Sequence, residues 1–226
     1  MRDGVIGEAE ARNALRTRLD VSRETFQKLD RYAELLSKWS AGTNLVSANS
    51  LRQVWSRHFL DSAQILAPAE CRRPSRWADF GSGAGFPGMV VAILAHDRLP
   101  DLRVTLFESH ARKCAFLDTV SRETFTPVTI VNERVEPLRP GVSDQATGRF
   151  DVISARAFAP LAKLLGIASG RLETGGVCLF PKGKGYDREI ADARKEWAFD
   201  VVERVSLTDP RARILEIGGI SRVQPL

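Results

Sequence analysis

The sequence predicts an α/β fold: a mostly parallel sheet that ends in an antiparallel hairpin, preceded by a helical cap. The first 73 residues carry apolar side chains at helical spacing, whereas strands and helices alternate from residue 74 onward. A glycine-rich turn joins the first strand to the helix after it. A length of 226 residues suits one such domain with an appendage, so we expect a cap at 1–73 and the main domain at 74–226.

The N-terminal segment is expected to form a helical cap without an independent core. Ser22 is a suitable N-cap for a helix whose apolar residues run from Phe26 to Trp39. Ser50 is the expected cap of the next helix, which carries His58 and Asp61 one turn apart. A further helix is expected at 8–19.

The main domain is expected to be a parallel sheet with right-handed helical crossovers. We expect strands at 76–80, 104–108, 128–132, 150–154, 177–181, 201–207 and 213–217, and helices at 88–96, 111–125, 160–171 and 186–197. Only a short turn at Asp209–Pro210 separates the last two strands, which predicts an antiparallel hairpin at one edge. This pattern is typical of Rossmann-like methyltransferases and is absent from ordinary dinucleotide-binding dehydrogenases.

The glycine-rich turn Asp79–Gly88 (DFGSGAGFPG) is the sharpest local signal. It follows a predicted strand and opens a predicted helix, and glycines there allow positive φ and close approach of a ligand. The turn therefore predicts a binding site for an adenosine-containing cofactor. The residues expected around that cofactor are Asp79, which would face its ammonium group, together with Gly81, Gly83 and Gly85.

Glu108 ends the next strand, where a carboxylate can accept hydrogen bonds from both ribose hydroxyls of such a cofactor. NAD and S-adenosylmethionine share that ribose, so Glu108 does not separate them. Chain length does: roughly 150 residues follow the cap, about one domain, which leaves no room for a second nucleotide-binding half. The predicted cofactor is therefore S-adenosyl-L-methionine.

The charge balance is mildly basic, with 33 Lys and Arg, 28 Asp and Glu, and a net charge of +5. Five basic residues lie just beyond strand ends, on the expected ligand side, and are candidate RNA contacts: Arg112, Lys113, Arg134, Lys182 and Lys184. Solvated loops and helix starts are the alternative explanation for them.

Cysteine content and hydropathy narrow the class of protein. Cys71, Cys114 and Cys178 show no metal-ligand spacing, so we expect no metal site and a reducing, cytoplasmic location. No apolar run is long enough to span a membrane. We also expect a monomer.

Several motifs together carry a family resemblance. They are the glycine-rich turn, RHFLDS at 57–62, SARAFAP at 154–160, PKGK at 181–184, and a segment with Trp39 and Asn44–Leu45 in which Ser40 and Val46 depart from the usual residues. The combination, from about Leu35 to Gly183, resembles the RsmG family of bacterial 16S rRNA guanine-N7 methyltransferases, also called glucose-inhibited division protein B.

The resemblance implies methyl transfer to N7 of a guanine in the 530 loop of 16S rRNA, with 16S rRNA or the small ribosomal subunit as partner. It also implies cofactor contacts at Gly81, Phe86, Val135, Glu136 and Arg156, with Val135 and Glu136 holding the adenine edge.

The reaction chemistry explains the lack of an obvious catalytic base. Guanine N7 has an in-plane lone pair and no proton to lose, so catalysis can rest on positioning and on management of charge. Arg156, at the end of the fourth strand, is the expected catalytic residue in that positioning sense; pairing with a nearby acid is its alternative. His58 and Asp61 are expected to orient the cap, or to be a packed histidine with a local partner.

Three other functions are compatible with the sequence. A methyltransferase of this fold acting on a small molecule or a protein would lack a basic face around its pocket. An NAD-dependent oxidoreductase would bind NAD. A non-catalytic RNA-binding protein would bind RNA regardless of S-adenosylmethionine.

Overall fold

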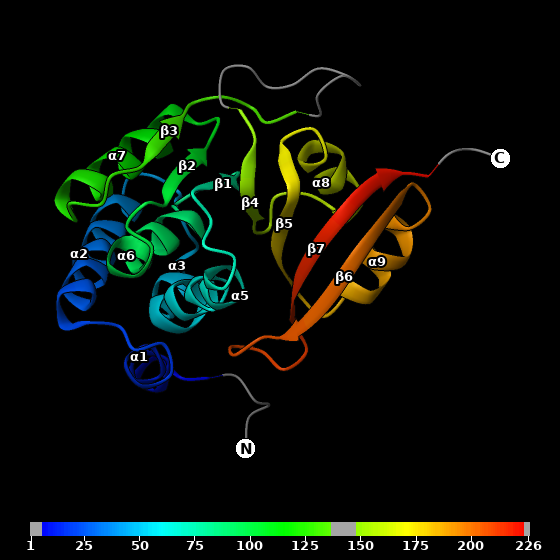
Figure 1. Ribbon diagram of the computed structural model, residues 1–226. Coiled ribbons are helices and arrows are strands. Elements are labelled where there is room, and N and C mark those ends of the chain that lie inside the picture. The colour runs from blue at the N-terminus through cyan, green and yellow to red at the C-terminus, as the bar shows by residue number, and fades with distance from the viewer. Residues whose placement is uncertain (1–5, 137–147, 224–226) are drawn as a thin grey trace.

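The computed structural model describes residues 6–136 and 148–223, which form a seven-stranded sheet with helices on both faces (Figure 1). The strands are β1 (Arg76–Phe80), β2 (Arg103–Phe107), β3 (Thr129–Val131), β4 (Phe150–Ala155), β5 (Leu172–Lys182), β6 (Trp197–Val205) and β7 (Arg213–Arg222). The helices are α1 (Glu8–Thr17), α2 (Arg23–Ser40), α3 (Ala48–Leu51), the π-helix η1 (Trp55–Leu60), α4 (Asp61–Ala63), α5 (Leu66–Glu70), α6 (Gly88–Arg98), α7 (Ala111–Glu123), α8 (Leu161–Ala168) and α9 (Tyr186–Ala193). No helix among the described residues is long and apolar enough to cross a membrane.

The sheet has the strand order β3-β2-β1-β4-β5-β7-β6. β1 to β5 are parallel, and β7 is antiparallel to both β5 and β6, which confirms the predicted sheet with its C-terminal hairpin. The chain order reverses between β1 and β4. In open α/β sheets a crevice forms at such a point, outside the carboxyl ends of the strands, and ligands bind there.

Two apolar clusters cover the two faces of the sheet. One cluster joins the cap helices, α6 and α7 to one face; the other joins α8 and α9 to the opposite face. In Figure 1 the cap, α6 and α7 lie together on one side of the sheet, with α8 and α9 on the other. Cap residues such as Phe59 and sheet residues such as Trp77 belong to one continuous core. The boundary between a cap at 1–73 and a main domain at 74–226 stays a prediction.

The first cap helices follow local signals in the sequence. Ser22 caps α2, as predicted, because its hydroxyl accepts a hydrogen bond from the Thr25 amide at 3.1 Å. Ser50 is not a cap, which corrects the prediction: Ser47 caps α3, and its hydroxyl accepts from the Ser50 amide at 3.2 Å. The expected single helix is also broken into short pieces around η1.

Several strands are longer than predicted: β7 continues to Arg222, and β5 and β6 begin earlier than expected. Residues 172–176 were left outside any strand, but β5 already begins at Leu172. Trp197 was predicted to end a helix and instead begins β6, where Trp197 and Phe199 are buried and the intervening Ala198 is exposed. That alternation is the pattern of a strand with one covered face, and burial of both aromatic rings against α8 and α9 outweighs the helical signal.

Gly85 provides a test of cap docking. Its φ is +94°, and a Cβ there would lie 2.4 Å from the Tyr32 hydroxyl and 2.8 Å from Met89 Cβ. The Tyr32 hydroxyl donates a hydrogen bond to the Ala84 carbonyl at the same place. We expect Gly85→Ala to lower the free energy of unfolding by roughly 2–4 kcal/mol, through backbone strain and overpacking, in urea titrations.

Gly42→Ala is the control for that substitution, because no atom lies within 4 Å of the added Cβ and φ is ordinary. We expect its stability to stay within about 0.5 kcal/mol of the parent. Equal stabilities of the two variants would show that the cap does not pack against the glycine turn as described.

Candidate cofactor and RNA site

A cavity of about 460 Å³ opens at the carboxyl ends of β1, β2 and β4. The loops after these strands form most of its wall, and the cap adds Leu45, Val46 and His58. The predicted cofactor-binding residues that line it are Gly81, Gly83, Phe86, Glu108, Val135, Glu136 and Arg156. Asp79 and Gly85, also predicted, do not line it.

The glycine turn leaves free space at one position. Gly81 and Gly83 have φ of +67° and +59°. A Cβ on Gly81 would lie 2.2 Å from the Phe158 ring, whereas a Cβ on Gly83 would meet nothing nearer than the Gly81 carbonyl at 3.8 Å. Gly83 therefore faces open cavity, as expected of a backbone that a cofactor approaches closely.

The Asp79 side chain does not line the cavity, so its contact with the ammonium group of the cofactor stays a prediction. Its side chain is fully buried below the turn, where Oδ2 accepts from the Gly88 amide at 3.1 Å and Oδ1 accepts from the Ser154 hydroxyl at 2.7 Å. It joins β1 to β4 and to the first turn of α6, and does not face the cavity. Burial raises the pKa of Asp79 to about 6, and its hydrogen bonds offset only part of this rise.

Glu108 lies at the cavity wall, as predicted, with its carboxylate held in place. Oε1 accepts from the His110 amide at 2.8 Å, and Oε2 accepts from the Gly83 amide at 2.9 Å. Burial would raise the pKa of Glu108, but hydrogen bonds from His110, the charge of Lys113 and a hydrogen bond from Gly83 outweigh it and hold the pKa below its usual value. A carboxylate fixed beside the glycine turn suits the two hydroxyls of a ribose.

Arg156 is held by the cap. Its Nη1 donates to the Arg57 carbonyl and to Asp61 Oδ2, both at 2.9 Å, and its Nη2 donates to His58 Nδ1 at 2.9 Å. Its guanidinium carbon lies 5.2 Å from the centre of the Phe86 ring. Arg156 thus pairs with an acid, the alternative noted from the sequence, and also lines the cavity.

His58 and Asp61 both contact Arg156, so each helps to attach the cap to the cavity. Because Nδ1 of His58 accepts from an arginine, the proton of its neutral ring is on Nε2. Burial, followed by the charges of Arg156 and Arg57, lowers the pKa of His58 to about 3. The imidazole is therefore neutral, and its basic nitrogen is already engaged.

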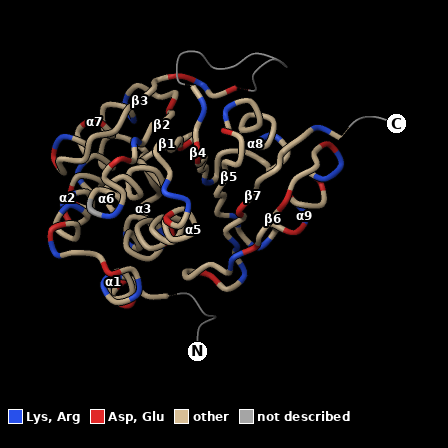
Figure 2. Tube along the Cα trace, viewed as in Figure 1, with Lys and Arg blue, Asp and Glu red and all other residues tan. Residues whose placement is uncertain are grey.

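The candidate RNA contacts lie in three settings. Lys113 and Arg134 line the cavity, and Arg112 and Lys184 are exposed outside it. Lys182 has a side chain only 10% exposed; its Nζ pairs with Glu189 Oε2 at 2.6 Å and donates to the Ala159 carbonyl. This local ion pair makes Lys182 unsuitable as a phosphate contact. Over the rest of the chain, basic and acidic residues are interspersed (Figure 2).

Sequence reasoning missed several residues of the cavity wall, among them His110, Phe158 and Lys163. Phe158 follows Arg156 by two residues, across Ala157 in a left-handed conformation with φ +51°. Its ring is partly exposed and lies against Gly81. Position just after a strand end was an available signal for Phe158 and His110, since parallel strand ends meet at this edge.

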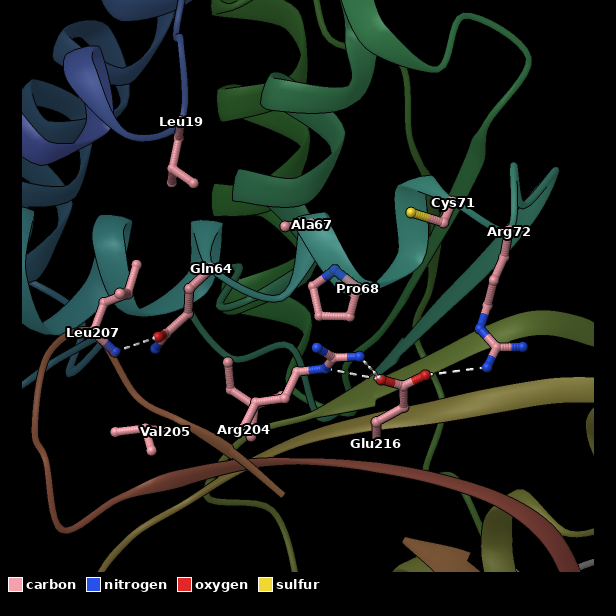
Figure 3. Close-up of a pocket in the computed structure, with 11 residues that line it drawn as sticks. Leu19, Gln64, Ala67, Pro68, Cys71, Arg72, Arg204, Val205, Leu207 and Glu216 are labelled. Carbon is pink, nitrogen blue, oxygen red and sulfur yellow. Dashed lines mark hydrogen bonds and ion pairs between the residues drawn. The ribbon is translucent and has the colours of Figure 1, made fainter. Parts of the chain in front are cut away.

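A second cavity, of about 550 Å³, lies between the cap and the β6–β7 hairpin (Figure 3). Its charged side chains pair with one another: Glu216 accepts from Arg72 at 3.1 Å and from Arg204 at 2.7 Å. Although larger, it lies away from the glycine turn and the carboxyl ends of β1 and β2, so we assign the cofactor to the smaller cavity.

Asp79 gives a pH-dependent test of this geometry. Because its folded-state pKa is raised, its contribution to stability is present below about pH 4 and is lost as pH rises through about 6. Relative to Asp79→Asn, which cannot ionise, the protein should lose about 2–3 kcal/mol of unfolding free energy between pH 4 and 7. Chemical denaturation at a series of pH values measures this.

Asp151→Asn is the control, for which the expected pH dependence of stability has the opposite sign. Asp151 accepts from the Ser75 and Arg76 amides, and despite partial burial these hydrogen bonds hold its pKa below the usual value. The parent should therefore gain stability over this variant as pH rises from 3 to 5. If the difference in unfolding free energy between the parent and Asp79→Asn did not change with pH, the Asp79 carboxylate would have to be exposed to water.

Comparison with known proteins identifies the family of the chain. The sequence model of the family "rRNA small subunit methyltransferase G" matches residues 25–215. The ribosomal RNA small subunit methyltransferase G of Ruegeria sp. is 45% identical over 91% of this chain and 96% of that protein. The protein of the same name from Paramagnetospirillum magneticum is 46% identical over 92% of this chain and 95% of its own length.

Solved structures support the fold. Cofactor-bound Rv0187 from MTB has a TM-score of 0.55 and 15% identity, covering 84% of this chain and 88% of that one. An SAH-bound Podospora anserina methyltransferase has a TM-score of 0.52 and 14% identity, covering 87% and 95%. The prediction of a Rossmann-like methyltransferase is confirmed, and the chain belongs to the rRNA small subunit methyltransferase G family as an S-adenosylmethionine-dependent enzyme.

Proposed function

We propose that this enzyme transfers a methyl group from S-adenosyl-L-methionine to N7 of a guanine in the 530 loop of 16S rRNA. Family membership supports an rRNA substrate. The observation that carries the choice of atom is the engagement of His58: its Nδ1 accepts from Arg156 and its pKa is about 3. This side chain cannot serve as a base near neutral pH, and N7 needs none.

Cofactor binding is assigned to the turn and the loops after β2 and β3. Gly83 leaves space for the cofactor, Glu108 offers a fixed carboxylate for its ribose, and Val135 and Glu136 stand where the adenine edge is expected. When bound, S-adenosylmethionine supplies a methyl group activated by a positively charged sulfur. Arg156 then contacts the target guanine or the cofactor and holds it in line, which makes it the proposed catalytic residue.

RNA binding is assigned to basic side chains at the cavity and around it. Lys113 and Arg134 line the cavity, Lys163 adds a third cation, and Arg112 and Lys184 are exposed nearby on loops or helix starts after the strands. Charges there suit phosphates of an RNA whose target base enters the cavity. Small-subunit rRNA in the cytoplasm is the proposed partner, and a monomer the proposed form.

Mapping of N7-methylguanine tests the function. The purified protein, 16S rRNA or small subunits from cells lacking the gene, and labelled S-adenosylmethionine should yield one N7-methylated guanine, located by cleavage at methylated positions. We expect that site in the 530 loop. Methylation at another atom or another loop would contradict the proposal, as would transfer to a small molecule or a protein with no transfer to RNA.

Gly83→Val tests the cofactor cavity. The side chain would project into space that the cofactor needs, so we expect calorimetry to show at least a 100-fold loss of S-adenosylhomocysteine affinity. Gly175→Val is the control, since Gly175 also has positive φ (+79°) and open space around its Cβ but lies outside the cavity. Equal losses in the two variants, or tight NAD binding by the parent, would contradict the assignment.

The basic residues are tested through the salt dependence of RNA affinity. Removing one phosphate contact should flatten the slope of log affinity against log salt by about 0.7–0.9. We expect this for Arg112→Ala and Arg134→Ala. Arg122→Ala is the control, because Arg122 is 71% exposed but pairs with Asp118 near the other end of α7. Parental slopes in both test variants would remove these residues from the RNA interface.

A further inference from the structure

The turn between β6 and β7 touches the cap at Asp61. The Thr208 hydroxyl donates to Asp61 Oδ1 at 2.8 Å. Gln64 Nε2 donates to the same oxygen at 3.0 Å. Gln64 Oε1 accepts from the Leu207 amide at 2.7 Å (Figure 3). The turn therefore binds Asp61 twice, once directly and once through Gln64.

Asp61 joins this turn to Arg156. Its Oδ1 is occupied by Thr208 and Gln64, and its Oδ2 accepts from Arg156 Nη1 at 2.9 Å. The side chains of Asp61 and Arg156 are only 19% and 17% exposed. A carboxylate with hydrogen bonds to both oxygens has little freedom to rotate, so its contact fixes the guanidinium plane.

The π-helix η1 supplies the other acceptors around Arg156. The Arg57 carbonyl and His58 Nδ1, both from η1, accept from Nη1 and Nη2. A π-helical turn inside a helix is rare and often marks a functional site. Arginine has a long, flexible side chain, so several fixed acceptors lower the entropic cost of holding it in one geometry.

We propose that Thr208 and Gln64 are positioning residues for methyl transfer: from the β6–β7 turn they fix Asp61, and Asp61 fixes Arg156 at the cavity. The inference rests on the proposed role of Arg156 in the reaction. The C-terminal hairpin then contributes to the rate without touching either reactant.

Thr208→Val is the sharpest variant, because it keeps the side-chain shape and removes the hydroxyl. We expect the single-turnover rate at saturating RNA and cofactor to fall about threefold to tenfold, because Asp61 loses its hydrogen bond from this hydroxyl, which also pairs with the Ser206 hydroxyl at 2.9 Å. S-adenosylhomocysteine affinity and the melting temperature serve as parallel readouts. Asp209→Ala is the matched control: Asp209 pairs with Arg211 in the same turn, and in the described part of the chain its side chain makes no hydrogen bond to Asp61.

A double-mutant cycle separates positioning from general stability. In an Arg156→Ala background, Thr208→Val should have no further effect on the rate, because the residue through which it acts is gone. A similar fall in both backgrounds would overturn the inference, since Thr208 would then act elsewhere. A parental rate for Thr208→Val, with Arg156→Ala impaired, would overturn it while leaving the proposed function intact.

Arginine side-chain NMR gives a readout that does not depend on activity. Three paired acceptors should slow rotation of the Arg156 guanidinium, so its Nη resonances, assigned by their loss in Arg156→Lys, should be resolved in the parent. They should broaden or merge in Thr208→Val and persist in Asp209→Ala. Unchanged resonances in Thr208→Val would overturn the inference even if no RNA methylation were detected; loss of methylation alone would count against the proposed function.

Discussion

The buried carboxylate of Asp79 is the constraint on which the site depends. It binds the first turn of α6 through the Gly88 amide and β4 through Ser154, so three elements meet at one fully buried side chain. Burying an ionisable group is costly, as its raised pKa records. The close fit is visible at Gly88, where a Cβ would lie 2.5 Å from Asp79 Cβ. The glycine turn above it is thereby fixed before any ligand binds.

Three acids around the cavity already hold a donor in place. Asp79 fixes the turn from below, Glu108 holds the Gly83 amide at the wall, and Asp61 holds Arg156. His58 is likewise committed to Arg156. An enzyme that had to remove a proton from its substrate would need one such group free, with a matched pKa. These side chains serve to position other groups. This suits guanine N7 as the nucleophile, because N7 already carries a free lone pair and has no proton to lose.

Local sequence signals predicted the central strand β1 and the loops at the site better than the elements near the edge of the sheet. β1 has the bounds that were expected, and the residues after β1 and β2 came together because parallel strands place their carboxyl ends at one edge. Sequence patterns were a poor guide where tertiary packing decides. Trp197 was expected to end a helix but begins β6 and packs with α8 and α9, and Asp79 was expected to face the cofactor but its side chain is buried. The partners of Arg156 lie nearly 100 residues away, beyond the reach of any local pattern.

The antiparallel direction of β7 explains how the hairpin reaches the site at all. Because β7 runs against β5, Arg213 at its start pairs with Lys182 at the end of β5. The turn before Arg213 is therefore carried to the same edge as the carboxyl ends of the parallel strands, next to the cap. A seventh strand parallel to β5 would put its preceding connection at the opposite edge, far from Asp61. The topology that distinguishes this fold from dinucleotide-binding domains thus also places Thr208 within hydrogen-bond distance of Asp61.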